Sequence, residues 1–116
     1  MALVTTKQML INAQKDNYAV GAFNVENVEM VMAVVEAAEE LNSPVIMQTT
    51  PSTVKYADEN YLLAIIEKAS EINNIPLTFH LDHHENVEDI KRIIKLGCKS
   101  VMIDARSEER RVGKEC

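Results

Sequence analysis

Three histidines and one aspartate lie within five residues, His80-Leu81-Asp82-His83-His84. The cluster stands where an apolar, strand-like run at residues 76–81 gives way to a helical pattern that begins near Val87. Neutral imidazole is a good zinc ligand, and a carboxylate beside it can accept and donate protons. The cluster therefore predicts a catalytic metal site at the end of a strand. The alternative is structural, with one histidine hydrogen-bonded in the core and the others solvated in a loop.

His80 and His84, the outer histidines of the cluster, are less suited to a chemical role than His83. His80 has the same strand parity as Asp82, so we expect it to point to the same face, as a core histidine beneath the site. His84 follows the end of the expected strand, and we expect it to be a loop residue.

Helical and strand-like patterns alternate along the chain. Apolar residues recur at steps of three and four in the helical segments, whereas the strand-like segments are short and continuously apolar, as in a strand buried on both faces. Asn86 is an expected N-cap, and Gly97 lies at an expected helix end. A hydroxyl-rich loop is expected at residues 49–53. The expected helices cover residues 5–16, 27–41, 60–73 and the segment after Asn86, and the expected buried strands cover residues 18–24, 45–48, 77–81 and 100–103.

This alternation indicates an α/β fold with a parallel sheet and right-handed crossovers. An open dinucleotide-binding sheet normally carries a G-x-G-x-x-G motif, and that motif is absent from a chain with only three glycines. Polar residues instead lie at the carboxyl end of each expected strand, which is where the active sites of barrel enzymes are found. Singly, each could be a cap or turn residue. Together they favour a (β/α)8 barrel: Asn24, Thr49 or Thr50, Asp82 with His83, and Asp104.

Composition excludes several classes of partner. The net charge is -6 and the pI is about 5.0, which argues against nucleic-acid binding and against an anionic membrane surface. The first ten residues do not resemble a signal peptide, and no apolar run is long enough to cross a membrane, so we expect a cytoplasmic protein. Cys98 and Cys116 lie at no metal or redox spacing, and we expect both to be reduced.

Three segments resemble a known family: GAFNVENVEMVMAVVEAAEELNSPVI, HLDHHENVEDI and GCKSVMID. They resemble the amino-terminal part of class II, metal-dependent fructose- and tagatose-bisphosphate aldolases, over about residues 2–105. HLDHH is especially similar to the tagatose-bisphosphate branch. The resemblance implies that residues 1–105 form the amino-terminal half of a TIM barrel, with four of its eight strands. It also implies a homo-oligomer, a dimer or tetramer, for the full-length enzyme.

The resemblance further implies a reaction and a set of residue roles. Such enzymes cleave a ketose 1,6-bisphosphate to glycerone phosphate and glyceraldehyde 3-phosphate, and zinc (Zn2+) stabilises the resulting enediolate. By match to the motif, Asp82 would move the proton of the C4 hydroxyl and His83 would bind zinc. Asn24 and Thr50 would contact substrate. Asp104 would lie near the metal, where it orients a ligand or holds the metal in a second position.

The chain also departs from the family. After Ala105 the family continues with a Ser and then a loop that contains Pro and Asn, whereas this chain continues with RSEERRVGKEC at residues 106–116. We expect these residues to be a non-native tail, with a genuine charged terminus as the alternative. The family's other zinc ligands and phosphate loops lie in the second half of the barrel, so we expect this chain to be an inactive piece.

Two further hypotheses remain open. One is a self-associating half-barrel module that binds zinc or another ligand. The other is a metal-independent barrel enzyme that uses Asp82 and a histidine as an acid-base pair. Tagatose and fructose bisphosphates differ only at C4, and the sequence does not distinguish between them.

Overall fold

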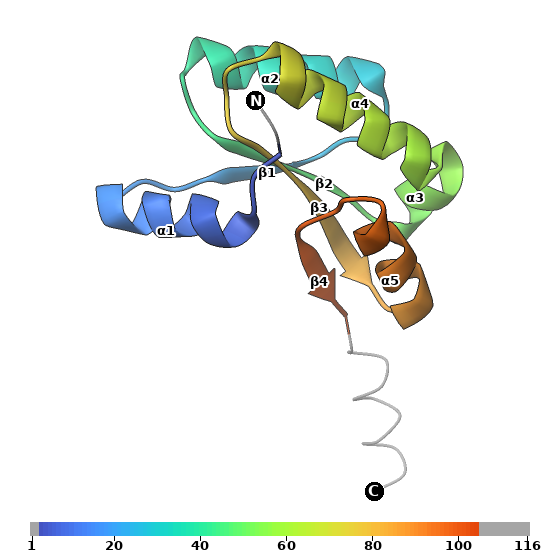
Figure 1. Ribbon diagram of the computed structural model, residues 1–116. Coiled ribbons are helices and arrows are strands. Elements are labelled where there is room, and N and C mark those ends of the chain that lie inside the picture. Colours follow the sequence, from blue (N-terminus) through green and yellow to red (C-terminus); the bar gives the residue numbers. More distant parts are fainter. Residues whose placement is uncertain (1–2, 105–116) are drawn as a thin grey trace, which may run out of the picture.

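The computed structural model describes residues 3–104 of the chain, which form one parallel sheet covered by helices (Figure 1). The strands follow one another across the sheet in the order β1-β2-β3-β4, which confirms the expected parallel α/β arrangement. A doubly wound sheet reverses its strand order at a switch point. The unbroken order therefore favours winding in one direction, as in a barrel. The strands are β1 (Gly21–Asn24), β2 (Val45–Thr49), β3 (Leu77–His84) and β4 (Val101–Ile103).

Five helices connect and cover these strands, and side chains cap most of their starts. Thr5 accepts a hydrogen bond from the backbone N–H of Gln8 at 3.2 Å, and Asn27 and Asn86 cap their helices in the same way. Gly97, with φ of 121°, follows the end of the last helix, as expected. The helices are α1 (Thr6–Asp16), α2 (Val28–Glu40), α3 (Pro51–Ala57), α4 (Glu59–Ile72) and α5 (Val87–Lys95).

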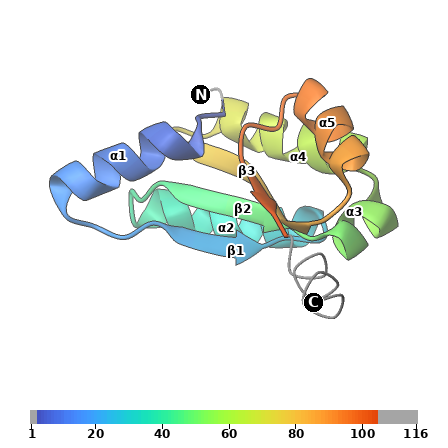
Figure 2. The ribbon, with the colours of Figure 1, turned by 90° about the horizontal axis from the view of Figure 1, so that it is seen from below.

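The two faces of the sheet have different coverings. Alternate residues of β3, Leu77, Phe79 and Leu81, are fully buried in a core that includes residues of α2, α4 and α5. Helices α2 and α4 lie side by side on this face, and Figure 2 views the sheet from the opposite side. On that opposite face Thr78 donates a hydrogen bond to the Val4 carbonyl at 2.8 Å, just before α1. Among residues 3–104, the first helix thus lies at the amino ends of the strands and not at their carboxyl ends (Figure 2).

Three sequence-based predictions are wrong. The first strand is shorter than residues 18–24 and is exposed rather than buried, because β1 is the edge of the described sheet. The hydroxyl-rich segment is not a loop, because Thr49 ends β2 and Pro51 opens α3, where the fixed φ of proline suits a first helical turn. His84 is not a loop residue either: β3 continues to it, and only 2% of it is exposed.

Three further expectations concern membrane spans, the two cysteines and the C-terminal tail. Among residues 3–104 no helix is long and apolar enough to cross a membrane. Cys98 is a free, buried thiol, and burial raises its pKa. Cys116 and the expected non-native tail, residues 106–116, lie outside the described residues.

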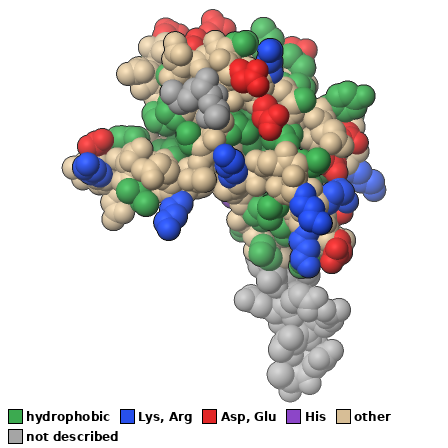
Figure 3. Space-filling model, in the orientation of Figure 1, with side chains coloured by type: hydrophobic (Ala, Val, Ile, Leu, Met, Phe, Trp, Pro, Cys, Tyr) green, Lys and Arg blue, Asp and Glu red, His purple; other side chains and the backbone are tan. Residues whose placement is uncertain are grey.

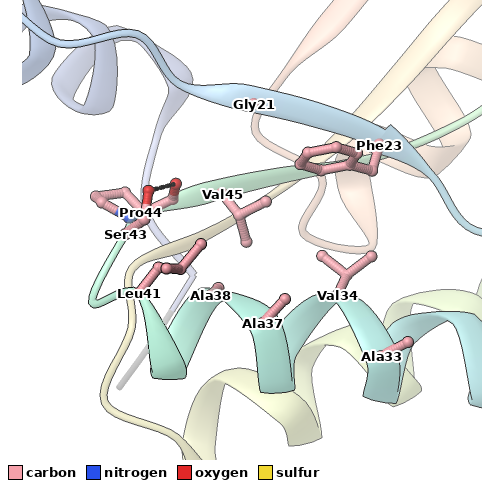
Figure 4. A pocket seen from close by; sticks show the side chains of 10 residues that line it. All are labelled: Gly21, Phe23, Ala33, Val34, Ala37, Ala38, Leu41, Ser43, Pro44 and Val45. Carbon is pink, nitrogen blue, oxygen red and sulfur yellow. Dashed lines mark hydrogen bonds between the residues drawn. The ribbon is translucent and has the colours of Figure 1, made fainter.

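Apolar side chains are exposed at both edges of the sheet. Phe23 of β1 is 51% exposed and Ile103 of β4 is 63% exposed. Hydrophobic side chains are visible over β4 and between α1 and the helices α2 and α4 (Figure 3). An apolar cavity of about 330 Å³ lies between β1 and α2, with Phe23 and Val34 on its walls (Figure 4). Unpaired edges with apolar neighbours favour association.

We therefore expect the 116-residue chain to self-associate and to bind a hydrophobic dye such as anilinonaphthalene sulfonate. Phe23→Ser should weaken both, because it removes the aromatic wall of the cavity, whereas Tyr56→Ser, which removes an exposed aromatic ring on α3, should change neither. Analytical ultracentrifugation and dye fluorescence measure these effects. A cooperatively melting monomer that binds no dye would contradict the expectation.

Candidate active site

The carboxyl end of β3 is irregular, and the irregularity brings two polar side chains together. The pairing of β3 with β4 shifts between Leu81 and His84, as at a β-bulge. His83 has φ of 55°, in the left-handed region that residues with a Cβ rarely adopt. Successive residues of a regular strand point to opposite faces. Here the break in the pattern places His83 Nε2 3.4 Å from Asp82 Oδ2.

A second carboxylate approaches the same imidazole from the neighbouring strand. Asp104 follows β4, and its backbone N–H donates to the His84 carbonyl at 2.8 Å. Its Oδ2 lies 3.2 Å from His83 Nδ1. An ionised carboxylate only accepts hydrogen bonds, and a neutral ring has one proton for two carboxylate neighbours. The contact with Asp104 is the shorter, at 3.2 Å against 3.4 Å for Asp82, so we assign the proton to Nδ1 and the lone pair to Nε2. Metal-binding histidines are commonly oriented in this way, by a carboxylate on the other ring nitrogen.

The donor set can be compared with the needs of zinc. His83 has the chemistry and the orientation of one ligand, and its side chain is 45% exposed, so an ion can reach it. Structural and catalytic zinc sites use three or four protein ligands. Residues 3–104 contain no group of three or more His, Cys, Asp or Glu side chains placed to hold a metal. The described residues thus fit zinc as part of a ligand set.

His80 lies on the same face as Asp82 and contacts it from below. Its Nε2 is 3.5 Å from Asp82 Oδ1, and its Nδ1 is 2.6 Å from the hydroxyl of Ser100. The expectation that His80 would be a satisfied histidine beneath the site agrees with these contacts, although its side chain is 17% exposed. Sequence reasoning missed Ser100. Its position directly before β4 was the only available signal.

Asn24 joins this face through a hydrogen bond from the next strand. Gln48 Nε2 donates to Asn24 Oδ1 at 2.7 Å. Asn24 is in register with Gln48, and Gln48 with His80, so the three side chains form one polar row across the sheet. Sequence reasoning also missed Gln48, which it treated only as the end of a strand. The bond leaves the Asn24 amide nitrogen, a donor, available to a ligand.

Thr50 lies at the same edge of the sheet but in a separate cluster. It precedes α3, and its hydroxyl lies 3.1 Å from that of Ser52 and 3.4 Å from that of Thr53. The structure thus places Thr50 among hydroxyls at the start of a helix rather than beside Asp82 and His83. Hydroxyls gathered in this way can donate hydrogen bonds to a polar ligand.

His84 is a buried imidazole that is only partly satisfied. Its Nδ1 lies 3.1 Å from the Asp82 carbonyl, and Nε2 has no hydrogen-bond partner among residues 3–104. Burial lowers its pKa, although the bond to Asp82 acts in the opposite direction. The ring therefore supports the backbone of Asp82 through Nδ1.

This fold, with polar side chains gathered at the carboxyl ends of its strands, is the arrangement of the barrel-type α/β proteins. Comparison with known families identifies which one. Residues 4–111 match the model of the class II fructose-bisphosphate aldolases, and the chain belongs to that family.

Individual relatives agree with this assignment. The chain is 46% identical over 104 residues to the D-tagatose-1,6-bisphosphate aldolase subunit GatY of Klebsiella oxytoca, covering 90% of this chain and 37% of that protein. The YdjI aldolase of Escherichia coli K12 superposes with a TM-score of 0.80 at 31% identity, over 89% of this chain and 40% of that one. A putative fructose-1,6-bisphosphate aldolase of Coccidioides immitis superposes with a TM-score of 0.77 at 33% identity. The match covers 84% of this chain and 34% of that one. The chain thus spans between about a third and two fifths of the length of these relatives.

The left-handed backbone at His83 leads to a prediction about stability. Glycine adopts φ of 55° without the strain that a Cβ causes, so His83→Gly should be more stable than His83→Ala by about 1 kcal/mol. Both variants lose the imidazole, so their difference isolates the backbone. Urea denaturation measures it. Equal stability, or a more stable alanine variant, would show that the backbone at this position is not strained.

Proposed function

We propose that this chain carries the Asp82 and His83 part of the active site of a zinc-dependent aldolase that cleaves and forms a ketose 1,6-bisphosphate. The observation that carries the proposal is the contact series Asp82–His83–Asp104, at the carboxyl ends of β3 and β4. It joins a proton carrier, a metal ligand and a carboxylate that orients the ligand. Membership in the class II aldolase family supports the reaction type.

Each residue has a role that fits its position. Asp82, whose side chain is 15% exposed near the carboxyl end of β3, accepts the C4 hydroxyl proton in cleavage and returns it in condensation. His83 would hold zinc through Nε2, with its ring oriented by Asp104. When bound, zinc withdraws electron density from the ketone and stabilises the negative charge that cleavage produces. Zinc also needs ligands beyond those of residues 3–104.

Two residues at the rim would contact the substrate. Gln48 holds the Asn24 side-chain oxygen, so the Asn24 amide nitrogen is directed to donate to a substrate oxygen. The Thr50 hydroxyl, at the start of α3, would donate to a phosphate or hydroxyl group. The substrate is a phosphorylated ketose, and the 46% identical tagatose-bisphosphate relative favours tagatose over fructose 1,6-bisphosphate.

Substitutions at Asp82 and His83 separate proton transfer from metal binding. The test uses a chimera in which residues 4–104 replace the matching segment of the Klebsiella oxytoca relative. His83→Ala should lower zinc content and activity together, with partial rescue by added zinc. Asp82→Ala should keep zinc nearly stoichiometric while kcat for cleavage falls by roughly 100- to 10,000-fold. Metal analysis and a coupled cleavage assay give the two readouts.

The outcome that contradicts this assignment is specific. If Asp82→Ala loses zinc while His83→Ala retains it, the two roles must be exchanged. Activity that survives complete removal of zinc by a chelator would instead favour a metal-independent acid-base enzyme.

A separate prediction concerns the 116-residue chain alone. One oriented imidazole holds zinc weakly, so the chain should lack the turnover of about 1 to 1,000 per second that is ordinary for enzymes. Cleavage assays with both ketose bisphosphates, in the presence of zinc, measure this. Turnover in that range would show that the described cluster is sufficient for catalysis.

A further inference from the structure

His80 is held on one side by a hydrogen bond that the sequence did not predict. The Ser100 carbonyl accepts from the backbone N–H of Leu81 at 3.0 Å, so strand pairing fixes Ser100 beside His80. The Ser100 hydroxyl then lies 2.6 Å from His80 Nδ1, a short contact between half-buried groups. One hydrogen bond of this kind restricts rotation of the imidazole ring.

The other ring nitrogen faces the proposed proton carrier. His80 Nε2 is 3.5 Å from Oδ1 of Asp82, and Oδ2 of the same carboxylate faces His83 at 3.4 Å. A distance of 3.5 Å exceeds that of an ordinary hydrogen bond, so the contact is mainly electrostatic. It still matters, because the Asp82 side chain is only 15% exposed and water screens it little.

The contacts also determine which nitrogen carries the proton. An ionised carboxylate only accepts, so attraction to Asp82 requires a proton on Nε2. In a neutral ring Nδ1 is then an acceptor, and the Ser100 hydroxyl must be the donor. Donation from Ser100 thereby stabilises the tautomer that presents N–H to Asp82.

We propose that His80 is a positioning residue, in which Ser100 fixes the ring and the electrostatic attraction between Nε2–H and Oδ1 of Asp82 orients the carboxylate so that Oδ2 faces His83. The proposal rests on the proposed role of Asp82 in proton transfer. The arrangement assigns the two carboxylate oxygens different tasks, one anchored below the site and one directed to the reacting side. Fixing one oxygen of a carboxylate is enough to restrict its rotation about the Cβ–Cγ bond, so the direction of the second oxygen is fixed as well.

The first experiment reads the tautomer without any catalytic assay. Nitrogen-15 chemical shifts of the His80 ring, measured in the 116-residue chain at a pH where the ring is neutral, distinguish Nε2–H from Nδ1–H. We expect Nε2–H in the parent chain and a mixture of tautomers in Ser100→Ala. Thr78→Val is the matched control, because Thr78 lies two residues earlier on the same face and bonds to Val4 rather than to Asp82. It should leave the His80 shifts unchanged.

The second experiment uses the chimera described above. His80→Leu should lower kcat by roughly 10- to 100-fold, the usual effect of losing a supporting contact, with KM and zinc content nearly unchanged. His80→Gln should restore kcat to within about threefold of the parent, since its amide N–H can reach the same oxygen. Thr78→Val should lower thermal stability and leave kcat unchanged.

Several outcomes would overturn the proposal. An Nδ1–H tautomer in the parent chain would do so, as would unchanged shifts in Ser100→Ala. Equal losses of kcat in His80→Leu and Thr78→Val would show that His80 contributes only to packing and stability and does not position Asp82. If His80→Leu fails to fold, Ser100→Ala takes its place. The proposal then requires that Ser100→Ala lowers kcat in the chimera and shifts the tautomer of His80. If Asp82→Ala retains full kcat, the proposed function fails, whereas the tautomer result tests the His80 contacts separately.

Discussion

The alternation of side chains along β3 is the constraint on which the rest of the structure depends. The odd-numbered residues from Leu77 to Leu81 are fully buried in the helix-covered core, and His80 and Asp82 lie on the opposite face. β3 also pairs with both β2 and β4, so its register places the ends of both neighbouring strands. A shift of one residue would exchange the core and the polar face.

The break in that alternation creates the chemical site. A regular strand would direct Asp82 and His83 to opposite faces. The bulge and the left-handed backbone at His83 instead bring both side chains to one edge, where Asp104 arrives from β4. The neighbouring strand pairing must compensate for the strain, because unsupported left-handed residues with a Cβ are unfavourable. Stability and site geometry are therefore coupled at a single residue.

The polar face is organised in layers. Asn24, Gln48 and His80 share one level across three strands, and Asp82 lies one level higher, towards the carboxyl ends. Gln48 orients Asn24, and Ser100 orients His80. Residues with little chemical reactivity thus fix the direction of those with more. This division of tasks is common where a site must be preorganised before its ligand arrives.

Local sequence determined much of this protein. Apolar periodicity and capping residues predicted α1, α2, α4 and α5 to within a few residues, and the alternation of elements predicted the parallel sheet. The polar residues at strand ends, together with the family resemblance, singled out Asp82, His83 and Asp104, which the structure brings together. These features follow from neighbouring residues, so a single sequence carries them.

Tertiary structure decided what depends on contacts between distant segments. The exposure of β1 follows from its place at the sheet edge, and the burial of His84 follows from pairing with β4. Ser100 reaches His80 only because β4 packs in register against β3, twenty residues away in sequence. Its own neighbours give no sign of this contact. The sequence thus specified which groups could react, and strand pairing specified how those groups are held.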